Sequence, residues 1–493
     1  MTRTRITNAD WVVAWDEAAK THCYLRGADV VFEGDRILSV APHGTDAADG
    51  DEEHVVDGAG RMVMPGLVDI HTHLGHEPIN KGYTDETGSV GLYNSNLYEY
   101  MVTMFGDAEV MPWQTRMAMA ELLQSGVTTV VDMTIRYDGW IDVLAESGMR
   151  AVCAPMFRSA KWFTRNGHVV EYDWDVARGE AEMAVALDLV ARAEAHPSGR
   201  LSGMVVPAQI DTCTPELMRD SHAEAARLGV RWQTHAAQSL PEFHEITRRT
   251  GRTPIQWLAD LGVLDGNALI GHSIFLDDHP WTRWGTSDDL GLLADSGATV
   301  AHCPTVFQRR GMALTWFDRY RKAGVNVGIG TDTFPHNMIE EMRHALMVAR
   351  LAMGSHRGAT TAQVFDAATI GGAAALGRDD IGRLAPGAKA DLVLVDVTHP
   401  LMQPCRDPIR SLVYAAADRA VREVYVDGQQ VVADGRALNV DLARAAAEVH
   451  EGQRRSEAHV PERDLVAGRT GRQMSPPTYP IAGDNQTTQG ARP

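Results

Sequence analysis

The feature that most restricts the fold is a rhythm between residue 63 and about residue 330. A short β-branched or apolar run, a loop and a longer segment with helical apolar spacing follow one another repeatedly. Strands that alternate with helices predict a parallel sheet, and eight such units predict an α/β fold with a closed (β/α)8, TIM-like barrel. The expected strands are 63–70, 127–132, 150–156, 203–208, 230–235, 268–272, 299–302 and 325–330. The clearest helical segments are 111–124, 176–195, 215–228 and 290–296.

Two β-rich segments flank the predicted barrel. We expect residues 1–62 and 382–440 to form the N-terminal and C-terminal parts of one small β-sandwich, and residues 63–381 to form the barrel. Residues 441–493 are expected to form a C-terminal helix and an extended tail. The tail is predicted from about Arg463, because the chain there is rich in Pro, Gly, Thr and Gln and lacks apolar periodicity.

The charge and cysteine content narrow the classes of partner. With 46 Lys and Arg against 65 Asp and Glu, the net charge of −19 argues against binding to nucleic acid or an acidic membrane surface. A small neutral or cationic ligand fits that charge better. The five cysteines show no CxxC spacing, which indicates neither a disulfide framework nor a thiolate zinc site. No apolar run approaches the length of a membrane span, so we expect a cytoplasmic protein.

Two histidines end the first predicted strand, in the sequence Val68-Asp69-Ile70-His71-Thr72-His73. Residues i and i+2 of a strand face the same side, so both imidazoles can point into the mouth of the barrel toward one ion. Alone, a His-x-His pair is a weak signal, because satisfied core histidines are common.

Three further ligand-type residues follow other predicted strands. His235 ends the fifth strand, His272 ends the sixth, and Asp332 comes after the eighth. A barrel brings these strand ends together, and such a coincidence is not expected of structural histidines. Imidazole and carboxylate ligands without sulfur suit Zn²⁺, Fe²⁺ or Mn²⁺. The sequence therefore predicts a metal site at the carboxyl ends of the strands.

These strand-end residues, together with the motifs around them, resemble the amidohydrolase superfamily, in its branch of cytosine deaminase-like and triazine or chlorohydrolase-like enzymes. The resemblance covers residues 37–439. Its most specific motifs are Met64-Pro65-Gly66 before the first histidine pair, Ala301-His302-Cys303-Pro304-Thr305, and Gly328-Ile329-Gly330-Thr331-Asp332, with further matches at 126–129, 368–373 and 382–392.

The resemblance implies a ligand set and a stoichiometry. His71, His73, His235 and Asp332 would bind the catalytic metal, and His272 would be a fifth ligand or a close neighbour that contacts the water. Members with two metals carry a carboxylated lysine after the fourth strand, but residues 202–211 contain no lysine. We therefore expect one divalent ion per chain, Zn²⁺ first, with Fe²⁺ or Mn²⁺ as alternatives. Many members form dimers or larger assemblies, so a homo-oligomer is expected.

The resemblance also assigns catalytic roles. Asp332 would accept a proton from water and pass it to the leaving group. His302 occupies a position where members hydrogen-bond or polarise the substrate, although a structural histidine beside Cys303 is the alternative. Gln238 is a departure, because deaminases and dechlorinases of this branch usually have glutamate there, which protonates a ring nitrogen. An amide cannot transfer a proton. Gln238 in place of glutamate therefore favours attack of water on a carbonyl or amidine-like carbon over deamination of a ring.

Candidate substrate contacts lie in loops. Phe307 stands where related sequences often have asparagine, and Gln209 lies in a stretch that lacks the histidine often found there. Tyr83 in the first loop and Trp162 in the third are aromatic residues suited to stacking on a planar substrate, together with Gln238 and His302 as polar contacts. Packing of helices against the barrel explains such aromatic residues equally well.

Three functions remain open from the sequence. The first is a mononuclear hydrolase that cleaves a C–N bond in a small urea, cyclic amide or N-heterocycle, with xenobiotic phenylureas and triazines as examples. The second is an aminohydrolase or dechlorinase of a purine, pterin or triazine ring. The third, from another class, is a family member that has lost catalysis and serves as a binding or scaffold protein. Only Gln238 supports the third, whereas the retained ligands and Asp332 oppose it.

Overall fold

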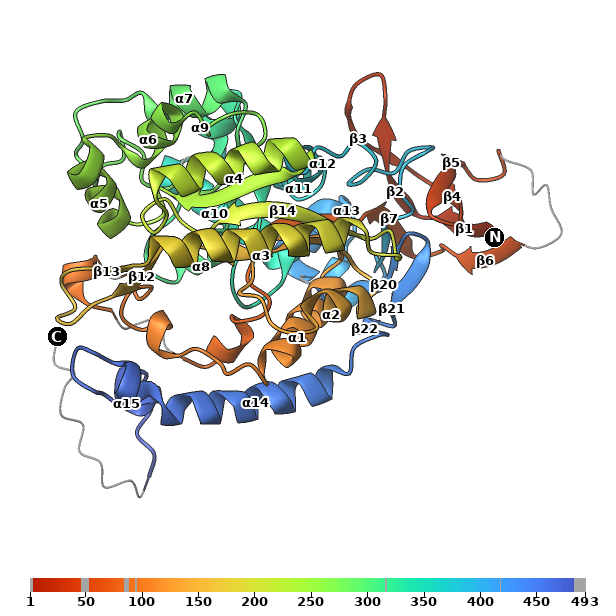
Figure 1. Ribbon diagram of the computed structural model, residues 1–493. Helices are drawn as coiled ribbons and strands as arrows, with labels where there is room; N and C mark the ends of the chain where they lie inside the picture. Colours follow the sequence, from red (N-terminus) through yellow and green to blue (C-terminus); the bar gives the residue numbers. More distant parts are fainter. Residues whose placement is uncertain are drawn as a thin grey trace.

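The computed structural model of the protein describes residues 3–45, 53–83, 88–93, 95–314, 317–416 and 418–482. A parallel sheet forms the centre of the molecule, and helices surround it (Figure 1). Its strands lie in chain order, and a bridge between Thr72 and Asp332 joins the last strand to the first. The strands are β8 (Leu67–Thr72), β9 (Val127–Asp132), β10 (Arg150–Cys153), β14 (Leu201–Pro207), β15 (Arg231–Ala236), β16 (Ala268–His272), β17 (Thr299–His302) and β18 (Asn326–Ile329). The predicted barrel is confirmed.

The first predicted strand is wrong at its start. Residues 63–65 belong to β7 (Arg61–Pro65), which pairs with a strand from the C-terminal part of the chain instead of with the barrel. Gly66 separates the two strands, and a Cβ atom there would lie 2.0 Å from the Thr128 hydroxyl oxygen. The chain thus passes between two sheets at a point too close for any side chain. A continuous apolar run gives no sign of this change of sheet.

The two ends of the chain meet in a small pair of sheets beside the barrel. One sheet contains β1 (Arg3–Ala9), β4 (Ala28–Glu33), β5 (Arg36–Pro42) and β6 (Glu53–Asp57). The other contains β2 (Trp11–Asp16), β3 (Thr21–Leu25), β7, β19 (Leu392–Asp396), β20 (Val421–Val426), β21 (Gln429–Ala433) and β22 (Arg436–Ala437). Ile6, Phe32 and Leu394 lie in the buried core that these sheets share. The predicted domain boundary after residue 62 falls within β7.

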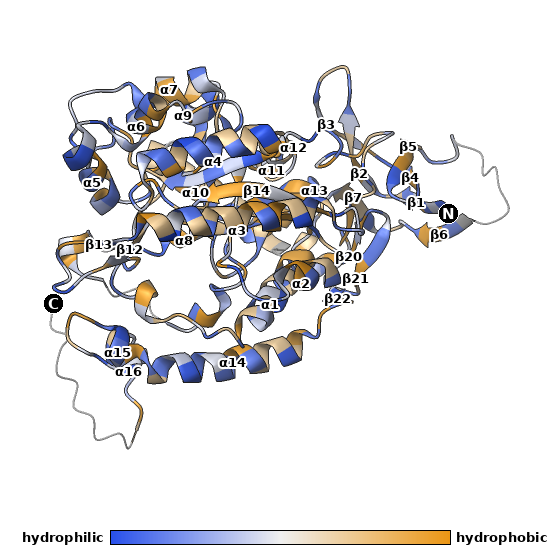
Figure 2. Cartoon of the chain, viewed as in Figure 1, coloured by the Kyte–Doolittle hydropathy of each residue, from blue (hydrophilic) through white to orange (hydrophobic). Residues whose placement is uncertain are grey.

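Local signals explain where the outer helices begin and end. The Thr214 hydroxyl accepts a hydrogen bond from the Leu217 amide at the start of α4 (Pro215–Leu228), and Gly229 ends the helix with a φ of 70°. Figure 2 shows β14 coloured as hydrophobic between helices that carry many hydrophilic residues. The other helices of the barrel region are α1 (Met111–Gln124), α2 (Trp140–Glu146), α3 (Val176–Glu194), α5 (Leu240–Thr250), α6 (Pro254–Leu261), α7 (Asp289–Ser296), α8 (Pro304–Gln308), α9 (Phe317–Lys322), α10 (Met338–Met353), α11 (Thr361–Ala367), α12 (Ile370–Ala375) and α13 (Pro408–Ser411).

Shorter elements complete the loops of the barrel. Short helical turns are η1 (Pro78–Asn80), η2 (Val90–Leu92), η3 (Met101–Thr103), η4 (Pro400–Met402) and η5 (Leu412–Ala416). The short strand β11 (Met156–Phe157) pairs with β14, and β12 (Ala160–Phe163) forms a hairpin with β13 (Glu171–Trp174). No helix among the described residues is both long and apolar enough to cross a membrane.

The C-terminal segment covers the long loop that follows β8. Its helices are α14 (Leu442–Ala458), α15 (Val460–Arg463) and α16 (Gly471–Met474), and Figure 1 shows α14 along one side of the barrel. Arg455 makes two hydrogen bonds to Asp107, at 2.6 and 3.0 Å, and Met474 is fully buried. In the segment predicted as a tail, Arg469 donates a hydrogen bond of 2.8 Å to Glu99, so the prediction is wrong as far as residue 475. The predicted tail beyond residue 482 lies outside the described residues.

Candidate active site

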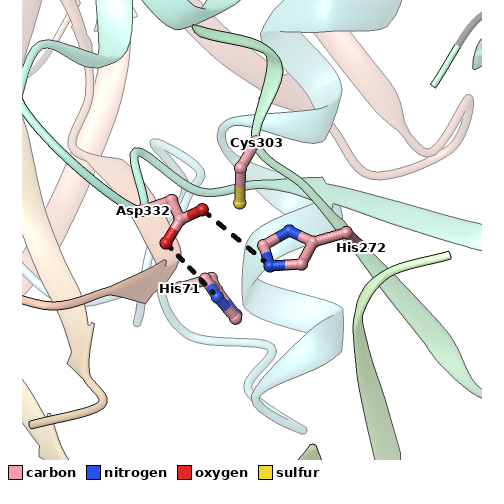
Figure 3. Close-up of side chains that lie close together, drawn as sticks. All are labelled: His71, His272, Cys303 and Asp332. Atoms are coloured by element: carbon pink, nitrogen blue, oxygen red, sulfur yellow. Dashed lines mark ion pairs between the residues drawn. The ribbon is translucent and has the colours of Figure 1, made fainter. Parts of the chain in front are cut away.

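The five predicted ligands converge at the carboxyl ends of the barrel strands. His71 lies on β8, His73 follows it, His235 and His272 lie on β15 and β16, and Asp332 follows β18; all are buried. The Asp332 carboxylate lies 3.2 Å from His73 Nε2, and 3.8 Å from the Nε2 atoms of both His71 and His272. Figure 3 shows this carboxylate facing the rings of His71 and His272.

The hydrogen bonds of the histidines leave their Nε2 atoms facing one another. His73 Nδ1 and His235 Nδ1 each lie 2.5 Å from a backbone carbonyl oxygen, of Met133 and Ala208, so both Nδ1 atoms donate. The two Nε2 atoms lie 3.3 Å apart. Two neutral imidazoles that donate through Nδ1 both present Nε2 lone pairs, which repel unless a cation lies between them.

His71 adds a third nitrogen of the same kind. Its Nδ1 lies 2.6 Å from the Gln233 side-chain oxygen, and its buried Nε2 has no hydrogen-bond partner. The Nε2 atoms of His71, His73 and His235 therefore converge with the Asp332 carboxylate, and the described residues supply no hydrogen-bond donor that all four groups could share. This donor set fits a divalent cation that accepts nitrogen and oxygen ligands.

The electrostatics of the cluster agree with this reading. Burial raises the pKa of Asp332, but the hydrogen bond with His73 and the neighbouring histidines outweigh it and hold this pKa well below its ordinary value. Burial lowers the pKa of His73, but the hydrogen bond and charge of Asp332 raise it to about 9. A proton and a cation therefore compete for His73 Nε2. Burial lowers the pKa of His71 to about 4, so its imidazole is neutral.

A buried carboxylate fixes the backbone around the two ends of the cluster. Asp69 accepts hydrogen bonds from the Thr331 hydroxyl at 2.7 Å and from the His71 amide at 3.2 Å. Asp332, the residue after Thr331, has a φ of 59°, which is unusual for a residue other than glycine. Asp69 thus holds β8 and the end of β18 in the positions that bring His71 and Asp332 together.

The sequence reasoning missed Cys303. Its sulfur lies within 4.8 Å of the ligand atoms of His71, His272 and Asp332, and Figure 3 shows it beside them. Cysteine spacing gave no signal, because the other ligands come from different strands. Burial raises the pKa of Cys303 well above its ordinary value, which keeps the thiol protonated and makes it a weak ligand.

A cavity of about 400 Å³ opens above the cluster. Gln238, Phe307 and Trp162 line it, together with His73, His235, His272 and Asp332. Gln238 is buried, and its side-chain nitrogen has no hydrogen-bond partner. Phe307 packs edge-on against His272 with 4.6 Å between ring centroids. Trp162 donates a hydrogen bond of 2.9 Å to Asp211. Gln238, Phe307 and Trp162 therefore line the same cavity as the ligand cluster.

Two candidate contacts lie elsewhere. His302 is buried with its ring 5.9 Å from that of Phe317, and it is not among the described residues that line the cavity. Burial lowers the pKa of His302 to about 3. Tyr83 lines a separate, smaller cavity near Met104. Tyr83 packs in the hydrophobic cluster that contains Met104 and Met474, and no periodicity in the sequence predicts this position.

The cavity also contains residues that the sequence analysis did not select as contacts. Arg158 follows β11, Lys161 lies on β12, Gln209 follows β14, and Glu77 comes from the first loop. From the sequence, Gln209 stands out only because related sequences often have a histidine in this stretch. These positions lie in the segments that connect the barrel strands, where strand-end spacing gives no information about which side chain faces inward.

Comparison with known proteins identifies the family and agrees with the fold. Residues 62–431 match the Amidohydrolase family. The chain belongs to this family. A 5-methylthioadenosine/S-adenosylhomocysteine deaminase from Desulfitobacterium hafniense is 30% identical over 427 residues, covering 86% of this chain and 93% of the relative. A deaminase of the same name from Halobacterium salinarum is 30% identical over 434 residues, covering 87% and 93%.

Solved structures share the same fold. An adenosine deaminase from Xanthomonas campestris with bound zinc has a TM-score of 0.79 and 23% identity, covering 93% of this chain and 99% of its own. An atrazine chlorohydrolase from Arthrobacter aurescens complexed with zinc has a TM-score of 0.76 and 23% identity, covering 91% and 100%. The family and barrel expected from the sequence motifs are confirmed, and with them the expectation of an amidohydrolase enzyme.

Proposed function

We propose that this amidohydrolase cleaves a C–N bond of a small molecule with one divalent ion held by the histidine and aspartate cluster. The ligands would be His71, His73, His235, His272 and Asp332. The observation that carries the proposal is the convergence of buried histidine nitrogens and one buried carboxylate, in which His71 Nε2 has no hydrogen-bond partner. Zn²⁺ is the expected ion, since it is bound in the two structures compared above, with Fe²⁺ and Mn²⁺ as alternatives.

A divalent ion held by these residues would supply Lewis-acid chemistry, making water more acidic and polarising the substrate. Asp332 both touches the ligand cluster and lines the cavity, so its carboxylate can accept the proton of the attacking water. The same carboxylate then passes this proton to the departing nitrogen. Its low pKa keeps Asp332 ionised and ready to accept.

Two amides support a substrate that both donates and accepts hydrogen bonds. The Gln238 side-chain nitrogen and the Gln209 side-chain oxygen are buried at the cavity and have no hydrogen-bond partner. A buried polar group without a partner costs about 1–3 kcal/mol, so a substrate that satisfies both groups gains affinity. Ureas and cyclic amides present a carbonyl oxygen beside an N–H group. Gln238 would then bind the substrate without transferring a proton.

The second candidate is deamination of a heteroaromatic ring, as in the second reading of the sequence. It is favoured by the names of the two deaminase relatives. With Gln238 in place of glutamate, another group would have to protonate the ring. His302 does not line the cavity, so its role would be structural, beside Phe317. Phe307 and Trp162 would contact the substrate, and Tyr83 would support the first loop.

The test is a screen of zinc-loaded protein against aryl ureas, cyclic amides, aminotriazines, pterins and purines, with ammonia and organic amine measured separately. The Asp332→Asn variant serves as the control, because it removes the proton acceptor. Asp332-dependent release of an organic amine or opening of a cyclic amide supports the first function. Asp332-dependent release of ammonia from a ring supports the second. Turnover that is unchanged in the Asp332→Asn variant contradicts the proposed site.

A further inference from the structure

One guanidinium in the substrate cavity lacks a protein partner. Arg158 follows β11 and lines the cavity together with the metal-binding cluster. Within the described part of the chain, the structure gives Arg158 neither a hydrogen bond nor an ion pair. Burial lowers the pKa of Arg158, because the guanidinium has left water without a carboxylate beside it. Arg158 is half-buried, and a half-buried guanidinium without a protein partner is available to a ligand in the cavity.

The acidic groups nearest to Arg158 are already used by other side chains. Asp211 accepts hydrogen bonds from Trp162 at 2.9 Å and from Tyr172 at 2.8 Å. Glu182 lies 3.8 Å from Arg178. Neither carboxylate reaches ion-pair distance of the Arg158 guanidinium. The partner that would neutralise Arg158 is therefore not supplied by the described residues around it.

The charges that line the cavity favour an anion on this side. Among the described lining residues, the carboxylates are Asp332, which belongs to the ligand cluster, and Glu77. The Glu77 amide donates a hydrogen bond of 3.2 Å to the His73 carbonyl oxygen, so Glu77 lies beside the ligand cluster. Lys161 lies three residues beyond Arg158 and lines the same cavity. A second cation next to an unpaired guanidinium makes the local potential positive, in spite of the net charge of −19.

We propose that Arg158 binds a carboxylate of the substrate, so that the hydrolysed compound carries an anionic arm. This inference rests on the proposed function and names the substrate class that the site would take. A planar guanidinium matches a carboxylate through two parallel hydrogen bonds, and Lys161 adds attraction as a point charge. The net charge of the whole chain leads us to expect a neutral or cationic ligand, but this expectation does not hold for the part of the cavity lined by Arg158 and Lys161.

The test uses pairs of compounds that differ only at one group. Each pair is an aryl urea or an aminated heterocycle with an acetate arm, and the same compound with the arm as a primary amide. Binding to the zinc-loaded protein is measured by calorimetry, and turnover is measured separately.

We expect the carboxylate member of at least one pair to bind about ten to a hundred times more tightly than the neutral member. Arg158→Gln should abolish this preference and leave binding of the neutral member nearly unchanged, and Arg158→Lys should restore part of it. The control is Arg165→Gln, which removes an exposed arginine paired with Glu171 outside the cavity and should keep the preference. A carboxylate bound by the metal alone would show no dependence on Arg158.

The two hypotheses fail in different ways. Equal binding within every pair, or a preference that survives in Arg158→Gln, overturns the role of Arg158 whether or not a compound is hydrolysed. A preference that depends on Arg158 without hydrolysis of any compound supports the anion site and counts against the proposed function. Unfolding temperatures of the variants show whether a loss of binding reflects a loss of fold.

Discussion

Replacing Gln233 should weaken metal binding although this residue is not a ligand. Gln233 lies on β15, and its side-chain oxygen lies 2.6 Å from His71 Nδ1. Both residues are fully buried. In a Gln233→Leu variant, the Nδ1–H group of His71 would lose its acceptor in a place that water does not reach. The ring would also lose the contact that points Nε2 at Asp332.

The magnitude follows from the cost of an unsatisfied buried donor, which is about 1–3 kcal/mol. Since about 1.4 kcal/mol corresponds to a factor of ten, the metal affinity should fall roughly ten- to a hundredfold, in line with other residues that orient metal ligands. Gln233→Glu should retain or raise the affinity, because a carboxylate is a better acceptor for the His71 Nδ1–H group.

The assay is competition for Zn²⁺ between the protein and a chromophoric chelator. Thr234→Val is the matched control, because Thr234 is buried on the same strand and its hydroxyl has no hydrogen-bond partner. This control should bind zinc as the parent protein does. A Gln233→Leu variant that remains folded and binds zinc with unchanged affinity would show that the hydrogen bond to His71 does not support the site.

Three further predictions concern the cluster and Gln238. Elemental analysis should find about one equivalent of divalent metal per chain, and His71→Ala or His235→Ala should lose most metal and all turnover; a second stable equivalent would contradict this. Asp332→Asn should stay folded, keep part of its metal and lower kcat by roughly 10² to 10⁴, so near-normal kcat in loaded protein would exclude Asp332 as the proton acceptor. Gln238→Ala should lower kcat/KM about tenfold, as expected for a lost neutral hydrogen bond. Gln238→Glu should not improve the native reaction, but it should add weak deamination of a triazine or pterin, and faster native turnover would favour ring deamination.

The sequence predicted the barrel and the ligand cluster because both depend on local regularities. Apolar runs mark the strands, and parallel strands end on one side of a barrel, so His235 and Asp332 could be placed together from spacing alone. Gln233 could not be assigned its role in this way. Its contact with His71 joins residues 162 positions apart and depends on how the strands are staggered around the barrel.

Loops account for what the sequence could not predict. Arg158 and Tyr83 lie in connecting segments, and only the packed structure shows that Arg158 lines the substrate cavity whereas Tyr83 lines another. The error in the C-terminal tail has the same origin. Arg469 reaches Glu99 across 370 residues, and a polar sequence without periodicity gives no sign of such a partner.

The packing of the C-terminal segment also sets an order of assembly. Phe105 lines the substrate cavity, and its carbonyl oxygen accepts hydrogen bonds from Ser456 at 2.5 Å and from Arg463 at 2.9 Å. During synthesis, every barrel strand and every proposed ligand leaves the ribosome before these two residues do. A nascent chain can therefore close the barrel and take up its ion while this wall is still unsupported. The ability to recognise a substrate would be acquired last, from a segment beyond the span that matches the family.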